Sequence, residues 1–221
     1  MPDLSRMSAA ALDAMKNVLD LEPSDAVLVV GDQSAGVCPD AFETAATGFG
    51  CAVERFQLPE ESRPLKSMPA GMVDLLDGKS VVINTIAGSS DEVPFRIEWL
   101  TAIEARDLRL GHCPGIEDGM FVDGPMSVDY GVMRDAAARL RAAFADAGSV
   151  HITTDAGTDI SLKIAGRPFV DDVHVSEEEK GCNLPCGEVY CCPHADGADG
   201  VLVVDGCFGG DGNVSVPVTL R

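Results

Sequence analysis

Apolar and polar positions repeat with two different periods over the first half of the chain. Residues 4–19 carry apolar side chains about every 3.6 positions, which predicts an amphipathic helix. The run 26–31 is continuously apolar, as is typical of a strand buried on both faces of a parallel sheet. The two patterns then recur: we predict helices over 39–48, 71–76 and 91–105, and strands over 51–58, 80–85 and 108–112.

Strands that alternate with helices are typical of βαβ units, whose short right-handed connections place successive strands parallel. The sequence therefore predicts the α/β class, with a Rossmann-like, mostly parallel sheet and helices on both of its faces. The loop after the first strand carries no dinucleotide fingerprint, because Gly31 and Gly36 lack the G-x-G-x-x-G spacing. Backbone donors for a pyrophosphate are therefore not specified there.

The character of the sequence changes near residue 149. A last helical pattern over 132–147 is followed only by strand and turn signals. Asp155 and Gly157 supply the turn of a predicted hairpin. The predicted strands cover 150–154, 159–164, 187–192, 200–205 and 214–220. We therefore expect two domains: a Rossmann-like α/β domain over 1–148, and a smaller β-rich domain over 149–221.

Charge and composition exclude several classes of partner. Sixteen basic against thirty-six acidic residues give a net charge of −20, so that nucleic acid and anionic membranes would be repelled. We find no signal-peptide pattern and no apolar run that approaches the length of a bilayer span, and we expect a cytoplasmic protein. In a reducing compartment the eight cysteines would be free or metal-bound rather than paired in disulfides.

The segment 181–194 concentrates the candidate chemistry of the second predicted domain. It holds four cysteines, one histidine and one isolated glutamate within fourteen residues. In one interpretation, Glu188 is a ligand of a divalent metal ion such as zinc, cobalt or manganese, because a carboxylate suits these ions. In the other, the ligands are thiolates and an imidazole, which select zinc or a softer metal. This second ligand set comprises Cys182, Cys186, Cys191, Cys192 and His194.

Two further features have a plainer interpretation beside the functional one. The spacing of the cysteines does not match paired C-x2-C knuckles, so Cys191 and Cys192 can equally be small side chains on a strand. His112 and Cys113 stand at the C-terminal end of a predicted strand, where open α/β sheets bind ligands. Adjacent strand residues point to opposite faces, which argues against a nucleophilic pair.

Six segments of the chain together resemble one protein family. They cover 115–121, 124–130, 151–159, 166–167, 183–190 and 200–206. The most specific is Asn-Leu-Pro-Cys-Gly-Glu-Val-Tyr at 183–190. The sequence is similar to the N-terminal portion of the thermophilic metallo-aminopeptidase family, also called aminopeptidase T.

The resemblance implies an N-terminal α/β domain and a second domain with a two-metal site that removes N-terminal residues from peptides. Glu188 matches the first metal-binding glutamate of the family, whereas its other ligands lie further along than this sequence extends. We therefore expect a metal-dependent hydrolase of peptides or small molecules if the site is completed, either within a homo-oligomer or by a second chain.

Two alternatives stay open. Relatives usually carry small or hydroxyl residues at three of the cysteine positions, so the chain can instead be a non-catalytic metal- or thiol-binding protein that uses the Cys182–His194 cluster. Relatives of this fold also include a ring-cleaving iron dioxygenase of dihydroxypyridines. A dioxygenase-like function is therefore the further alternative, since a fold does not fix a function.

Overall fold

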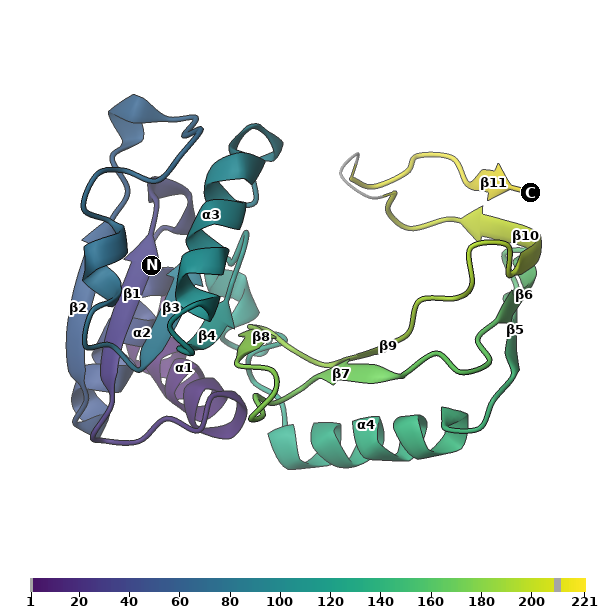
Figure 1. Cartoon of the computed structure of the whole chain (residues 1–221), viewed down its shortest axis with the longest axis horizontal. Coiled ribbons are helices and arrows are strands. Elements are labelled where there is room, and N and C mark those ends of the chain that lie inside the picture. Colours follow the sequence, from purple (N-terminus) through teal and green to yellow (C-terminus); the bar gives the residue numbers. More distant parts are fainter. Residues whose placement is uncertain (1, 209–211) are drawn as a thin grey trace. The chain divides into compact units, whose positions relative to one another are not determined.

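A fully parallel sheet forms the centre of the first of two units (Figure 1). Its strand order is β2-β1-β3-β4-β8, and each neighbouring pair is parallel. The strands are β1 (Ala26–Gly31), β2 (Ala52–Gln57), β3 (Val81–Thr85), β4 (Arg109–His112) and β8 (Gly181–Asn183). The computed structural model describes residues 2–208 and 212–221. This doubly wound order confirms the predicted α/β class and its mostly parallel sheet.

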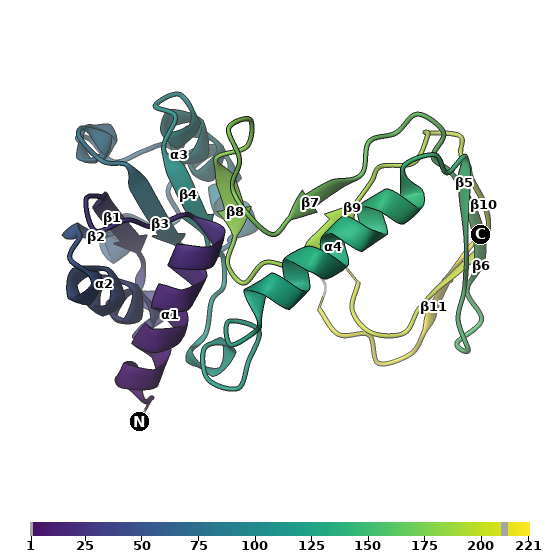
Figure 2. The same cartoon turned by 90° about the horizontal axis from the view of Figure 1, so that it is seen from below.

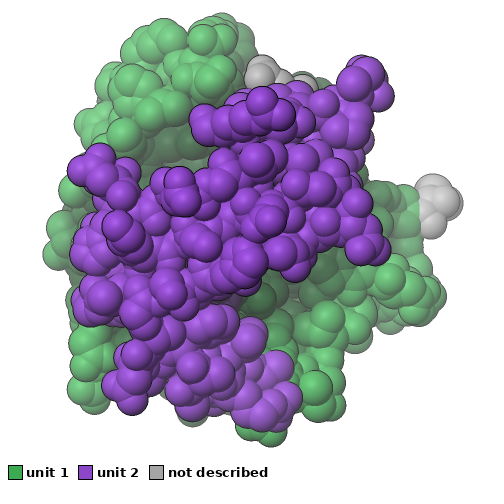
Figure 3. Space-filling model, turned by 90° about the vertical axis from the view of Figure 1, so that its right-hand side faces the viewer, with its two compact units in different colours: residues 1–135, 172–188 green, residues 136–171, 189–221 purple. Residues whose placement is uncertain are grey.

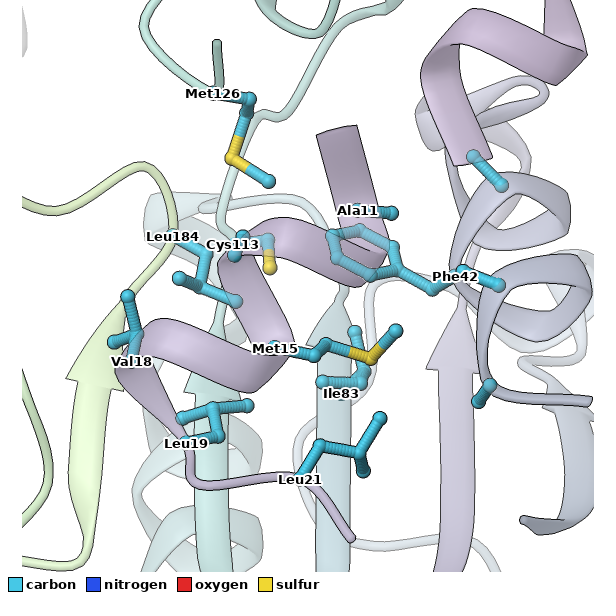
Figure 4. Close-up of a cluster of buried hydrophobic side chains, with 14 of the residues drawn as sticks. Ala11, Met15, Val18, Leu19, Leu21, Phe42, Ile83, Cys113, Met126 and Leu184 are labelled. Carbon is cyan, nitrogen blue, oxygen red and sulfur yellow. The ribbon is translucent and has the colours of Figure 1, made fainter. Parts of the chain in front are cut away.

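Helices cover both faces of this sheet (Figure 2). On one face, α1 (Leu4–Val18) packs against α2 (Cys38–Phe49), which has Pro39 in its first turn and ends at Gly50, where φ is 110°. Figure 4 shows part of this core, in which Met15, Phe42 and Ile83 come from α1, α2 and β3. On the other face, α3 (Val93–Glu104) buries Phe95, Trp99 and Ile103. Because both faces are covered, β1 and β3 are apolar throughout most of their length.

Two of the predicted helices differ in the structure because short 3₁₀ turns replace all or part of them. Residues 73–76 form a 3₁₀ turn rather than an α-helix, and the helix predicted over 91–105 divides into a 3₁₀ turn and α3. Pro94 lies in the first turn of α3, which fixes the start of the regular helix there. The 3₁₀ turns are η1 (Gln33–Ala35), η2 (Glu60–Ser62), η3 (Val73–Leu76), η4 (Ser90–Glu92) and η5 (Asp118–Met120).

The fifth strand of the parallel sheet comes from a segment that we expected in the second domain. β8 pairs with β4, with Gly111 beside Cys182 and His112 beside Asn183. The first unit therefore comprises residues 1–135 and 172–188, and the second comprises 136–171 and 189–221 (Figure 3). The chain passes between the units three times, whereas the sequence suggests one boundary at 148/149. Hydrogen bonding of β8 to the sheet is the physical reason for this difference.

The second unit is built on an antiparallel sheet of order β11-β10-β6-β5. Its strands are β5 (Ser149–Thr153), β6 (Asp159–Lys163), β10 (Ala198–Val204) and β11 (Val218–Leu220). The predicted hairpin joins β5 to β6, and the Gly157 N–H donates to the Thr154 carbonyl at 3.0 Å within its turn. α4 (Tyr130–Phe144) crosses from the first unit into the second, and β7 (Val170–Asp172) pairs with β9 (Glu188–Tyr190).

The two faces of the antiparallel sheet differ in polarity, with mainly polar side chains beside Val201 and Val203 on one of them. Residues paired across its strands share a face, and one face is apolar. The members of this apolar face are Val150, Ile152, Ile160, Leu162, Leu202, Val204, Val218 and Leu220. Ile152, Leu202, Val218 and Leu220 are each more than a third exposed. In the ranges that the structure describes, we find no helix with the length and apolar character needed to cross a membrane.

Candidate functional site

The segment 181–194 is divided between the two units. Cys182 lies in β8 and Cys186 in the turn after it, and both belong to the first unit together with Glu188. The chain then leaves this unit, so that Cys191, Cys192 and His194 belong to the second unit. Residues that are close in sequence are therefore held by different folded bodies.

Glu188 presents an exposed carboxylate at the start of β9. The residue before it, Gly187, has a φ of 134°, a left-handed value that favours glycine. The Gly187 N–H donates to the Asp172 carbonyl at 2.9 Å. This turn fixes where β9 begins opposite β7, and it leaves the Glu188 side chain accessible to an ion.

A thiol pair lies beside Asp172 in the first unit. The Cys182 Sγ donates to Asp172 Oδ1 at 2.7 Å, and the Asn183 N–H donates to the same oxygen at 3.0 Å. The hydrogen bond to Cys186, burial and the Asp172 carboxylate all raise the pKa of Cys182, because each favours its protonated form. The hydrogen bond from Cys182 lowers the pKa of Cys186. Cys182 is therefore a neutral donor near pH 7 rather than a thiolate.

The other candidate ligands, Cys191, Cys192 and His194, lie in the second unit and do not form a metal site. His194 Nε2 donates to the Ala165 carbonyl at 2.9 Å. Cys191 is half-buried and Cys192 is exposed, so neither is a core residue. Within residues 2–208 and 212–221, no group of three or more His, Cys, Asp or Glu side chains is arranged so that it could hold a metal ion. The cysteine-based metal site therefore stays a prediction without a preformed set of ligands.

A buried ion network lies at the C-terminal ends of β1 and β3, where the strand order reverses. Arg63 Nη1 donates to Asp32 Oδ2 at 2.6 Å. Arg63 Nε and Nη2 donate to the two carboxylate oxygens of Glu92 at 2.9 and 2.5 Å. The Ala87 N–H donates to Asp32 Oδ2 at 2.7 Å. Doubly wound sheets bind ligands at this crevice, but here its charged groups are paired with one another.

The network keeps both carboxylates ionised. Burial alone would raise the pKa of Asp32, but hydrogen bonds from Ser34, Ala87 and Arg63 outweigh burial and lower it. The hydrogen bond from Arg63 lowers the pKa of Glu92, against the opposing effect of burial. Both carboxylates in turn raise the pKa of Arg63. The network is thus a fully charged, mutually satisfied group at neutral pH.

His112 and Cys113 occupy opposite faces of the sheet, as the strand pattern predicts. Cys113 is buried in the core beside α1 and α2, and burial raises its pKa far above the physiological range. His112 lies on the α3 face, where its Nδ1 is 2.8 Å from Asn84 Nδ2. The two side chains cannot act as a nucleophile and its base.

The sequence patterns did not identify Arg63, Asp172 or Asp32 as members of a polar network. Arg63 lies in a proline-rich connection, and neither its spacing to Asp32 nor to Glu92 forms a local motif. Asp172 was visible as part of a short acidic cluster, but its contact with Cys182 depends on how β7 and β8 meet. An acidic residue directly after a buried strand, as Asp32 stands after β1, was the one usable signal.

Comparison with known families decides the relationship. The family model of NicX, 2,5-dihydroxypyridine 5,6-dioxygenase, matches residues 10–217, nearly the whole chain. The chain belongs to the NicX family. No curated protein matches it in a sequence comparison.

Two solved structures share the fold of this NicX-family chain. The 2,5-dihydroxypyridine dioxygenase of Pseudomonas putida KT2440 matches with a TM-score of 0.70 and 16% identity, over 99% of this chain and 65% of that one. Wild-type AmpT of Thermus thermophilus matches with a TM-score of 0.60 and 16% identity, over 90% of this chain and 64% of that one. The chain thus spans slightly less than two thirds of either protein's length.

These findings support the dioxygenase alternative better than the aminopeptidase hypothesis. The likeness to AmpT shows that the aminopeptidase resemblance reflects a shared fold. The family match and the likeness to the dihydroxypyridine dioxygenase favour the ring-cleaving alternative over the aminopeptidase reading. Both relationships are consistent with a metalloprotein, while the identity of the metal stays open.

Proposed function

We propose that this chain forms all or part of a dioxygenase that opens a dihydroxylated pyridine-type ring. The match of the NicX family model over residues 10–217 carries the proposal. The similarity to the 2,5-dihydroxypyridine dioxygenase structure covers 99% of the chain and is consistent with the proposal. At 16% identity this similarity shows a shared fold. A dioxygenase places both atoms of O2 in its ring-opened product, so the reaction needs no external reductant.

We propose Glu188 as the residue of this chain that binds the metal. Its carboxylate is exposed at a fixed turn, and a carboxylate is the ligand that non-haem iron oxygenases combine with two imidazoles. The four histidines do not gather beside it among the residues that the structure describes. The described part of the chain therefore does not fit a complete metal centre by itself.

The remaining ligands would come from outside the described residues: from a second copy, from another chain, or from the part of the related proteins' length that this sequence does not span. A homo-oligomer is supported by the apolar face of the antiparallel sheet, which exposes four large aliphatic side chains. Exposed apolar patches of this kind mark interaction surfaces in soluble proteins. The competing hypothesis is an aminopeptidase-type function, for which the substrates would be peptides.

One pair of assays tests the proposed reaction. Oxygen uptake is followed with 2,5-dihydroxypyridine after loading the protein with Fe(II), Mn(II), Co(II) or Zn(II) in separate samples. We expect substrate-dependent oxygen uptake with at least one of the four metals. We expect no hydrolysis of amino-acid p-nitroanilides with any of the four. Hydrolysis without oxygen uptake would restore the aminopeptidase reading and overturn the proposal.

A further inference from the structure

A second polar cluster lies at the C-terminal edge of the parallel sheet, away from Glu188 in sequence and independent of the proposed dioxygenase function. Asn84 is the last but one residue of β3 and His112 ends β4, and the two are directly paired in register on the α3 face. Asn183 continues the row on β8. Arg96, in the first turn of α3, lies at the same edge. Such an edge is where open parallel sheets bind small ligands.

The Asn84 amide is buried and only half satisfied. Asn84 is 2% exposed, and its Nδ2 donates to His112 Nδ1 at 2.8 Å. Its Oδ1 has no hydrogen-bond partner in the part of the chain that the structure describes. A buried polar atom without a partner costs roughly 1–3 kcal/mol, so such atoms usually mark a site that a ligand or water completes.

His112 presents its second nitrogen as a donor. Burial, followed by the positive charge of Arg96, lowers the pKa of His112, so the imidazole is neutral near pH 7. Because Nδ1 accepts the hydrogen bond from Asn84, the proton of the neutral ring is on Nε2. The half-buried side chain therefore offers one N–H to a ligand acceptor.

Arg96 supplies a positive charge at this edge. It takes part in none of the ion pairs formed by the described residues. Its Nη1 lies over Gly88, where an added Cβ would be 3.2 Å from that nitrogen and 3.7 Å from the Pro114 Cβ. The missing side chain at Gly88 thus leaves room for the guanidinium beside the strand that ends at His112.

The charges at this edge disfavour a ligand with two negative charges. Arg96 contributes one positive charge and His112 is neutral. Asp172 is the nearby anion, since its carboxylate raises the pKa of His112 and thus opposes Arg96. A dianion such as hydrogen phosphate would meet more repulsion than a carboxylate, whose planar shape also matches the guanidinium fork.

We infer that Asn84, His112 and Arg96 form a binding site for a small monoanionic hydroxycarboxylate. The carboxylate accepts hydrogen bonds from the Arg96 guanidinium and from His112 Nε2–H. The hydroxyl of the ligand donates to Asn84 Oδ1, which supplies the hydrogen bond that this buried atom lacks. The site recognises its ligand by one charge and one hydroxyl group, without a metal ion.

Histidine-ring NMR on the full chain tests this inference, with glycolate as the probe. Acetate lacks the hydroxyl, and inorganic phosphate replaces the carboxylate. His112→Gln assigns the His112 resonances among the four histidines. We expect saturable shifts of His112 with glycolate. Acetate should bind several-fold more weakly, because one hydrogen bond is worth about fivefold in affinity, and phosphate should also bind more weakly, because its second negative charge is repelled. The other three histidine rings should not move.

Two variants and one control decide whether the cluster is responsible. Arg96→Gln should weaken glycolate binding at least about tenfold, as expected for loss of a charge-assisted hydrogen bond. Gly88→Ala should weaken it less than Arg96→Gln does, because the methyl group would shift the guanidinium by only a few tenths of an ångström and leaves the charge unchanged. Arg106→Gln, near the other end of α3, should bind like the wild type. The inference is overturned if His112 does not respond to glycolate, if phosphate binds more tightly, or if Arg96→Gln and Arg106→Gln bind equally.

Discussion

Arg63 holds Glu92 by two parallel hydrogen bonds in a position where the Glu92 side chain is 1% exposed. The same guanidinium reaches Asp32, whose side chain is fully buried. One residue of a proline-rich connection thus ties the end of β1 to the start of α3. The network is a structural element of the first unit, and it occupies the edge at which related sheets bind nucleotides.

Removing Arg63 leaves two buried carboxylates without a counter-charge. Arg63→Met should lower the free energy of unfolding by about 3–5 kcal/mol, measured by urea denaturation. Arg106→Met is the matched control, because its ion pair with Asp77 is largely exposed and should contribute less than about 1 kcal/mol. Equal effects of the two substitutions would show that the buried network contributes no more than a surface pair.

The same network predicts the response to acid. The folded state lowers the pKa values of Asp32 and Glu92, so their stabilising effect is complete above the unfolded values of 3.8 and 4.5 and is lost as the pH falls through the lower folded values. Unfolding free energy measured from pH 7 to pH 2 should therefore decline below about pH 4.5. A triple variant, Asp32→Asn with Arg63→Met and Glu92→Gln, should show a shallower decline. An unchanged slope would contradict the assignment.

Gly200 controls strand pairing in the second unit. Its φ is 130°, and an added Cβ would lie 2.2 Å from the Asp159 carbonyl oxygen, which is backbone and cannot move aside alone. Gly200→Ala should therefore destabilise the pairing of β6 with β10 by more than about 1 kcal/mol. Hydrogen exchange should speed up in these two strands and stay slow in β1 and β3. Gly206→Ala, which meets no atom within 4 Å, is the control.

The apolar face of the antiparallel sheet predicts self-association. If a second copy covers this face, Leu220→Asp should shift the chain toward monomer in light scattering coupled to size-exclusion chromatography. Thr219→Asp adds the same charge one residue earlier on β11, on the opposite face, and should leave the assembly unchanged. A wild-type protein that is monomeric at high micromolar concentration would contradict the proposed homo-oligomer.

The sequence and the structure agree where the signal is local. The apolar spacing of residues 4–19 was sufficient to predict α1, and the continuous apolar run at 26–31 was sufficient to predict β1. β8 was missed because it has only three residues, and its partner β4 lies about seventy positions earlier. Its pairing also places Cys182 and Glu188 in the first unit.

The candidate sites also divide into features that are visible in the local sequence and contacts that only the folded chain creates. His112 was noted because it ends a strand, which a sequence reveals. Its partners Asn84 and Arg96 come from a neighbouring strand and from a helix, and only the folded sheet brings them together. The same holds for Arg63, whose two carboxylate partners lie 31 and 29 residues away. Polar contacts between distant segments carry no periodic signal, which is why sequence patterns do not reveal them.

Labelling with ¹⁸O₂ is the decisive test of whether this chain opens a dihydroxypyridine ring as a dioxygenase. After metal loading, the chain is incubated with 2,5-dihydroxypyridine under ¹⁸O₂, and the ring-opened product is analysed by mass spectrometry. We expect a product that carries two ¹⁸O atoms. This product should be almost completely lost in Glu188→Gln and retained in Glu177→Gln, an exposed acidic control. Absence of doubly labelled product with every metal, or full activity in Glu188→Gln, would contradict the proposed dioxygenase function or the role of Glu188, respectively.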